Sequence, residues 1–154
     1  MKNIEIGIPC GPNSERYANF LIKSIESTVF NMKAVKIIIG INKRNIDKSI
    51  ILESISSDIK FVERLSDESG SVGHGDCLNL ILENMSASAI GVFADVDSAF
   101  ICKDWDSILL NHMTENNISL IGSEYHKTDG KIVKLPNVIT AMFRVDALKS
   151  SKVN

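Results

Sequence analysis

Apolar, β-branched runs recur along the chain, and segments with helical periodicity separate them. The runs are Ile4 to Pro9, Val35 to Ile41, Ile59 to Val62, Ala89 to Ala94 and Ile118 to Gly122. Several of them are almost continuous, which is typical of strands that helices cover on both faces. The pattern therefore predicts an α/β fold, a three-layer α/β/α sandwich with a mostly parallel central sheet.

The segments between these runs repeat apolar residues at the spacing of a helix. The first predicted helix opens near Asn13 and Ser14, which are possible caps. The predicted apolar stripes of the four helices are Tyr17, Phe20, Leu21, Ile25 and Val29; Ile46, Ile50, Ile51 and Ile55; Cys77, Leu78, Ile81, Leu82 and Met85; and Trp105, Ile108, Leu109, His112 and Met113.

The alternation of predicted strands and helices changes after residue 123. Residues Tyr125 to Val133 carry an Asp-Gly turn between two short extended pieces, which predicts a hairpin, and Val138 to Val145 predicts another strand. The chain has 154 residues, and domains typically take about 150. Because no internal repeat and no Pro- or Gly-rich linker interrupts it, we expect residues 1–154 to form a single domain.

Composition and charge narrow the function classes. Hydrophobic residues make up 44% of the chain and charged residues 23%, as in ordinary globular proteins. Lys and Arg number 17 against 19 Asp and Glu, so no cationic excess is present to neutralise a nucleic acid. The three cysteines, Cys10, Cys77 and Cys102, form no CxxC pair and are expected to be reduced thiols. Without a signal-peptide pattern or an apolar run of about 18 residues, we expect a cytoplasmic protein with no membrane span.

Two carboxylates, Asp95 and Asp97, directly follow the fourth apolar run. In α/β sheets ligands bind beyond the carboxyl ends of the strands. Side chains two apart on an extended chain point to the same side, with Cα atoms about 6.5 to 7 Å apart. A hard divalent cation such as Mg²⁺ or Mn²⁺ relieves their repulsion and can in turn hold a diphosphate. The alternative is a pair of solvated loop acids, but the position at a strand end favours function.

A glycine-rich segment, Ser69 to Asn79, leads into the third predicted helix, whose N–H groups could meet an anion. It matches neither a Walker loop nor GxGxxG, and taken alone the segment favours a flexible turn. His74 within it could contact a base or a phosphate, but taken alone a solvated surface side chain is the favoured interpretation.

Taken together, these segments resemble family-2-type glycosyltransferases of the GT-A fold, whose donor is a nucleotide-sugar. Gly73 to Asn79 is similar to the GKxGALN segment of that family, and Ala94 to Ser98 is similar to its DADS stretch. Ile6 to Pro9 followed by Asn13 resembles the opening strand and PxxN-type turn, and Ala141 to Leu148 resembles the later strand and "FRRxAL" helix start. The segments follow one another in the family's order.

The resemblance implies a metal-dependent glycosyltransferase that moves a sugar from a UDP- or GDP-sugar donor to an unknown acceptor. Mn²⁺ or Mg²⁺ would be the cofactor, with Asp95 and Asp97 as its ligands. The implied nucleotide-sugar-binding residues are Pro9 at the base pocket, Asn42, His74 near the base or phosphates, Asn79, and Asp95 near the ribose.

The chain departs from the family pattern at two places. The second strand ends in Asn42 where an acidic pair is usual, which leaves the base open. In residues 149–154, which follow Leu148, there is neither the acceptor-side carboxylate base nor a QxxRW segment, so we expect this domain to lack most of the usual acceptor-side region. A non-catalytic or truncated nucleotide-sugar-binding module that needs a partner chain is therefore an alternative. A nucleotidyltransferase-like metal enzyme is a third, weakened because no glycine-rich, lysine-bearing loop follows the first strand. An oligomer is possible.

Overall fold

The computed structural model describes residues 3–65, 70–122, 125–126, 132–133 and 140–151. The helices are α1 Glu15–Thr28, α2 Lys48–Leu52, α3 Gly70–Asn84, α4 Trp105–Glu115 and α5 Val145–Ser150, with a 3₁₀ turn at Met32–Ala34. The strands are β1 Ile4–Cys10, β2 Val35–Ile41, β3 Ile59–Glu63, β4 Ile90–Ala94, β5 Leu120–Gly122, β6 Tyr125–His126, β7 Ile132–Val133 and β8 Thr140–Arg144.

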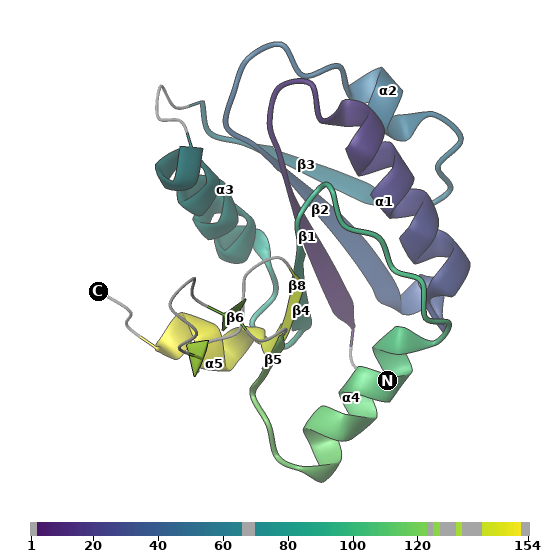
Figure 1. Ribbon diagram of the computed structural model, residues 1–154, viewed down its shortest axis with the longest axis vertical. Coiled ribbons are helices and arrows are strands. Elements are labelled where there is room, and N and C mark those ends of the chain that lie inside the picture. The colour runs from purple at the N-terminus through teal and green to yellow at the C-terminus, as the bar shows by residue number, and fades with distance from the viewer. Residues whose placement is uncertain (1–2, 66–69, 123–124, 127–131, 134–139, 152–154) are drawn as a thin grey trace.

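Six of these strands form one sheet in the order β3-β2-β1-β4-β8-β5. Strands β3, β2, β1 and β4 run parallel to one another, whereas β8 is antiparallel to both β4 and β5. Helices α1, α2 and α4 cover one face of the sheet, and α3 and α5 cover the other (Figure 1). The predicted three-layer sandwich with a mostly parallel sheet is therefore confirmed.

The two faces of the sheet pack differently. Alternate β1 residues, Ile4, Ile6 and Ile8, are buried under the α1 and α4 layer, where each is worth about 1.5–3 kcal/mol of hydrophobic stabilisation. On the other face, a Cβ at Gly7 would lie 2.4 Å from Ile81, and one at Gly40 would lie 2.6 Å from the Cys77 sulfur. Because these positions lack side chains, α3 packs directly on β1 and β2.

The predicted buried stripe of α1 is partly wrong. Tyr17 and Phe20 are 60% and 65% exposed. The buried face instead follows the spacing i, i+3, i+4 and i+7 through Ala18, Leu21, Ile22 and Ile25, all fully buried. The stripe of α4 needs a similar correction, since Trp105 and Met113 are buried but Ile108 is 54% exposed.

The glycine-rich segment also differs from the expected loop. Helix α3 begins at Gly70, so Gly73 and Gly75 lie inside the helix. Gly70 has φ +59°, a left-handed conformation that glycine adopts at little cost where the chain enters the helix. Ser69 lies outside the described residues.

The C-terminal predictions hold in the part of the chain that the structure describes. β6 and β7 pair antiparallel, which confirms the hairpin, although its Asp-Gly turn lies outside the described residues. β8 and α5 follow as the sequence predicts.

The three cysteines are free, with Cys10 and Cys77 buried and Cys102 exposed. Among the residues described, no helix combines the length and the apolar character that crossing a membrane requires.

Candidate functional site

The sheet order reverses direction between β1 and β4. The chain passes from β1 outward to β2 and β3, then returns to place β4 on the other side of β1. In an open α/β sheet this reversal leaves a crevice beyond the carboxyl ends of the two strands, where ligands bind. Two adjoining pockets lie there, of about 630 Å³ and 360 Å³, and they share Pro9, Gly11, Pro12 and His74.

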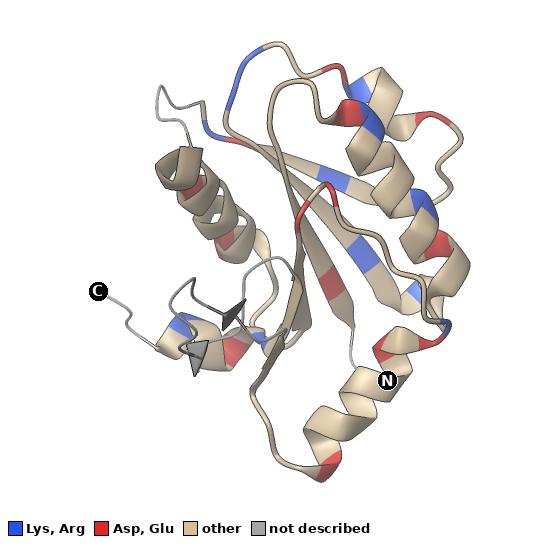
Figure 2. Cartoon of the chain, viewed as in Figure 1, with Lys and Arg blue, Asp and Glu red and all other residues tan. Residues whose placement is uncertain are grey.

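The larger of the two, here called the carboxylate pocket, is lined by Pro9, Gly11, Pro12, Asn13, Ser14, Tyr17, His74, Asp95, Val96 and Asp97. Its acidic residues sit on the turn after β4 (Figure 2). The Ser98 N–H donates to the Asp95 carbonyl at 3.0 Å, and the Ser98 hydroxyl donates to the same oxygen at 2.5 Å. The two acids are therefore on a turn rather than on the extended strand expected from the sequence, but both line one pocket.

Asp95 carries the main electrostatic irregularity of this pocket. Its side chain is 25% exposed, yet Oδ1 is fully buried and accepts no hydrogen bond from any described residue. The imidazole of His74 lies beside it, with Nε2 3.3 Å from Oδ1 but without a hydrogen bond between them. Burial raises the pKa of Asp95, His74 lowers it and Asp97 raises it further, with a net increase. The site thus holds an acceptor oxygen without a donor.

The carboxylate oxygens of Asp95 and Asp97 suit a divalent cation that binds together with a ligand. In the part of the chain that the structure describes, no cluster of three or more His, Cys, Asp or Glu residues could hold a metal by itself. Mg²⁺ in enzymes commonly takes only one or two carboxylates and completes its shell with water and substrate phosphates. Asp95 and Asp97 match that smaller share, and the Oδ1 of Asp95, which accepts no hydrogen bond, is an available ligand.

The smaller pocket, here called the amide pocket, is lined by Pro9, Cys10, Gly11, Pro12, Asn42, Lys43, Gly70, Gly73, His74 and Cys77. Asn42 is only 8% exposed, and its Nδ2 donates to the Gly73 carbonyl at 2.5 Å. A carbonyl only accepts, so the NH₂ group of Asn42 must face Gly73. The side-chain oxygen of Asn42 is then the acceptor that remains for a ligand.

Two thiols, Cys10 and Cys77, form part of the wall of this pocket. Burial raises the pKa of Cys10, and it raises that of Cys77 to about 11, so both are protonated at neutral pH. A protonated thiol is a poor nucleophile. The structure therefore favours a buried structural thiol at Cys10 over a catalytic group.

All but one of the predicted site residues meet at this edge of the sheet, namely Pro9, Asn42, His74, Asp95 and Asp97. The exception is Asn79, which is exposed on α3 and lines a separate pocket with Arg64 and Glu83. Tyr17 and Lys43 also line these pockets, and no role in the site was predicted for either of them. No pattern in the sequence pointed to Tyr17, because it fitted the apolar stripe that was predicted for α1.

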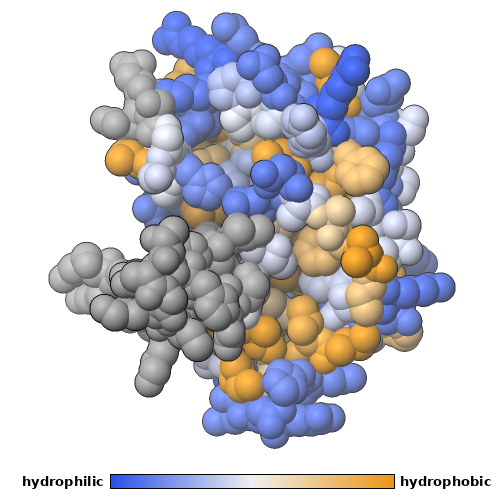
Figure 3. All heavy atoms as spheres, in the orientation of Figure 1, coloured by the Kyte–Doolittle hydropathy of each residue, from blue (hydrophilic) through white to orange (hydrophobic). Residues whose placement is uncertain are grey.

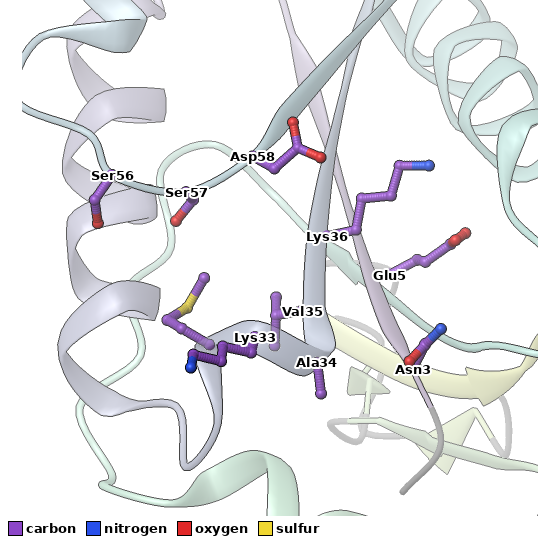
Figure 4. A pocket seen from close by; sticks show the side chains of 10 residues that line it. Asn3, Glu5, Lys33, Ala34, Val35, Lys36, Ser56, Ser57 and Asp58 are labelled. Atoms are coloured by element: carbon purple, nitrogen blue, oxygen red, sulfur yellow. The ribbon is translucent and has the colours of Figure 1, made fainter.

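A further pocket, of about 440 Å³, lies at the opposite edge of the sheet, where the strands begin (Figure 4). Glu5 of β1 and Lys36 of β2 are neighbours in register there. Glu5 is 7% exposed, and its Oε2 accepts a hydrogen bond from the Ser86 N–H at 2.8 Å. This buried acid has a backbone partner, unlike Asp95.

No protein-family model and no curated protein sequence matches the chain. Solved structures do. S. aureus TarS 1-349 is 18% identical with a TM-score of 0.69, over 96% of this chain and 48% of that one. The same protein in complex with UDP-GlcNAc is 16% identical with a TM-score of 0.65, over 96% and 46%. Mannosyltransferase PcManGT from Pyrobaculum calidifontis, in complex with GDP-Man and Mn²⁺, is 10% identical with a TM-score of 0.72, over 96% and 46%.

The chain spans about half the length of these solved glycosyltransferases, and almost all of it is included in each match. At this level of identity the likeness concerns the path of the backbone. It agrees with the strand order and with the crevice between β1 and β4. The chain has the GT-A glycosyltransferase fold.

Proposed function

We propose that this chain acts as a metal-dependent glycosyltransferase. It binds the nucleoside diphosphate of a UDP- or GDP-sugar across the amide and carboxylate pockets, and the sugar passes to an acceptor oxygen. The observation that carries the proposal is the buried Oδ1 of Asp95, which lacks a hydrogen-bond donor and stands beside Asp97 at the crevice of the sheet.

Charge balance supports a cation and a diphosphate together. Two carboxylates in one partly buried pocket repel each other, and the raised pKa of Asp95 reflects burial first and Asp97 as an added cause. A divalent cation offsets both negative charges, and phosphate oxygens complete its coordination. PcManGT, with GDP-Man and Mn²⁺ bound, shares the fold and supports the same combination here.

The amide pocket supports a base with an N–H on its pairing edge. The Asn42 side-chain oxygen is an acceptor, because its NH₂ group is held by Gly73. Uracil and guanine present a ring N–H on that edge, whereas cytosine presents a ring nitrogen that only accepts and donates only through its exocyclic amine. A contact from Asn42 to the ring position would therefore favour UDP- and GDP-sugars over CDP-sugars. Pro9 and His74, which line both pockets, would lie between the base and the phosphates.

Each residue has a defined task in the transfer. Asp95 and Asp97 would hold the cation, and Asn42 would fix the base. A bound divalent cation supplies Lewis-acid assistance by neutralising the negative charge on the departing nucleoside diphosphate. His74 Nε2, 3.3 Å from Asp95 Oδ1, would position that carboxylate.

A donor-binding module that depends on a partner chain is the second candidate, because the chain spans about half the length of the solved glycosyltransferases. Hydrolysis of the donor over hours separates the two. An enzyme releases sugar from UDP-GlcNAc or GDP-mannose, and it does so more slowly after Asp97→Asn. A module binds the donor and leaves it intact.

Thermal denaturation with UDP, GDP, CDP and ADP, each with and without Mn²⁺, tests the proposal. A ligand at 100 times its Kd stabilises by about 2.7 kcal/mol. For a domain of this size, each kcal/mol of stabilisation raises the thermal midpoint by about 2 to 4 °C, so we expect the midpoint to rise by roughly 5 to 11 °C. UDP or GDP with Mn²⁺ should give it. If neither nucleotide shifts the midpoint in the presence of Mn²⁺, the proposal is wrong.

A further inference from the structure

Tyr17 places an aromatic ring in the wall of the carboxylate pocket. It stands in the first half of α1, and the same pocket is lined by Asp95, Asp97 and His74. The side chain is 60% exposed, and its hydroxyl makes no hydrogen bond within the described part of the chain. Both the ring and the hydroxyl are therefore available to a ligand.

Packing of α1 does not require an aromatic residue at this position. The helix buries Ala18, Leu21, Ile22 and Ile25 completely, and this set already forms a full apolar face. Tyr17 lies beside that face and contributes little to the core.

Exposure alone does not single out Tyr17. Phe20, one turn later on α1, is 65% exposed, and Ile101 in the loop after β4 is 93% exposed. Figure 3 shows apolar side chains at the surface above α1 and this loop. Phe20 and Ile101 do not line the carboxylate pocket, however, whereas Tyr17 does. Phe20 is thus a matched residue, with similar exposure on the same helix but outside the pocket.

The walls of the pocket indicate the chemistry of its ligand. The lining includes the ring of Tyr17, the polar residues Asn13 and Ser14, and the two carboxylates. A sugar ring has the complementary surface, with apolar C–H faces and a rim of hydroxyl groups. Tyrosine provides a rigid contact of this mixed kind at a low cost in conformational entropy.

We propose that Tyr17 is a sugar-binding residue, whose ring stacks on the C–H face of a pyranose beside Asp95 and Asp97. The inference rests on the proposed function, which places a sugar at this end of the site. The same chemistry is present in the transferred sugar of the donor and in a sugar residue of the acceptor. The two sources are separated by experiment.

Four proteins are compared, the wild type, Tyr17→Ala, Tyr17→Phe and Phe20→Ala. In the donor arm, calorimetry with Mn²⁺ measures the affinity for UDP and UDP-GlcNAc, and for GDP and GDP-mannose. In the acceptor arm, saturation-transfer NMR measures the contact with methyl glycosides of glucose, mannose and N-acetylglucosamine. Thermal denaturation of each variant checks that the exposed substitutions leave the fold intact.

Tyr17→Ala should bind the sugar about three- to tenfold more weakly in one of the two arms, the range for an aromatic contact. It should bind UDP and GDP like the wild type, while Tyr17→Phe and Phe20→Ala keep the sugar affinity. The donor arm responds if the ring holds the transferred sugar, and the acceptor arm responds if it holds the acceptor. Equal sugar binding by Tyr17→Ala and Phe20→Ala in both arms would overturn the inference.

Failure of the proposed function has a separate signature. If the wild type binds neither UDP nor GDP with Mn²⁺, the proposed function is wrong. The methyl glycosides still report on Tyr17 in that case. Loss of their signal only in Tyr17→Ala would support the inference by itself, and an unchanged signal would refute it.

Discussion

Pockets lined by charged residues lie at both edges of the sheet, but the acidic side chains at the two edges differ in their hydrogen bonding. At the edge where the strands begin, Glu5 accepts a backbone hydrogen bond from Ser86, although it is buried. Nearby, Glu26 Oε1 accepts four hydrogen bonds, from the backbone and hydroxyl groups of Ser56 and Ser57, at 2.6 to 2.9 Å. At the edge where the strands end, Asp95 Oδ1 is buried without a hydrogen bond.

This difference shows that a pocket by itself does not identify a ligand-binding site. A buried acid with its hydrogen bonds satisfied stabilises the fold. A buried acid left unsatisfied costs stability, and such costs are commonly found where a ligand or metal supplies the missing partner. The proposed function therefore uses the Asp95 edge, and we expect Glu5 to contribute to stability.

Replacement of Asp97 or Asp95 by Asn should have the strongest effect on ligand binding. We expect the affinity for UDP or GDP with Mn²⁺ to fall about ten- to a hundredfold, the range for losing a contact to a charged group. Stability of the ligand-free protein should stay the same or rise in Asp95→Asn, because burial and Asp97 already disfavour its charge. Calorimetry and thermal denaturation measure the two effects. A large loss of stability without a loss of binding would reverse the comparison.

Glu5→Ala should show the opposite pattern. The substitution leaves the Ser86 N–H without its partner, which costs about 1–3 kcal/mol of the free energy of unfolding. Nucleotide affinity should not change, because Glu5 lies at the other edge of the sheet. Urea denaturation measures the first quantity and calorimetry the second. If Glu5→Ala is fully folded under the assay conditions and still binds the nucleotide more weakly than the wild type, the two edges are not independent.

Asn42→Ala should reduce the discrimination between nucleotide bases more than it reduces the overall affinity for nucleotides. The wild type is expected to prefer UDP or GDP to CDP, and the variant should lose about 1 kcal/mol of that preference, or roughly fivefold. Competition binding with the three nucleotides measures it. If the variant keeps the wild-type preference, Asn42 does not contact the base.

The smallest effect is expected from Glu26→Gln, and it depends on pH. Burial opposes the charge of Glu26, but the hydrogen bonds from Ser57 and Ser56 outweigh it and lower the pKa of the carboxyl group. Its contribution to stability is therefore present above the ordinary pKa of a glutamate and is lost as the pH falls through the lowered value. The difference in thermal midpoint between the wild type and Glu26→Gln should shrink towards pH 3. A difference that is constant with pH would contradict the assignment.

Much of the fold could be predicted from the sequence because the strands are nearly continuous apolar runs. The run Val35 to Ile41 coincides with β2, and each of the other runs overlaps a strand of the same sheet. Asp95 and Asp97 stood out because they follow such a run. A parallel sheet brings strand ends together whatever the details of the intervening segments.

The remaining features depend on contacts between distant parts of the chain. The hydrogen bond from Asn42 to Gly73 joins residues 31 positions apart, and it fixes which atom of Asn42 faces the ligand. Tyr17 fitted a helical stripe, and only the packing of Ile22 against the sheet shows that the helix turns it outward. Periodicity gives the width of an apolar face more reliably than its exact edges.

The dependence of nucleotide binding on the cation tests the proposed role of the Asp95 edge most directly. The affinity for UDP and GDP is measured by calorimetry in EDTA and in Mn²⁺, for the wild type and for Asp97→Asn. Formation of the Mn²⁺–nucleotide complex is common to both proteins, so the difference between them reports on the site. We predict that Mn²⁺ increases the affinity of the wild type at least about tenfold and that Asp97→Asn loses most of this increase. An equal response to Mn²⁺ in the two proteins, or no binding by either, would contradict a metal and diphosphate site at Asp95 and Asp97.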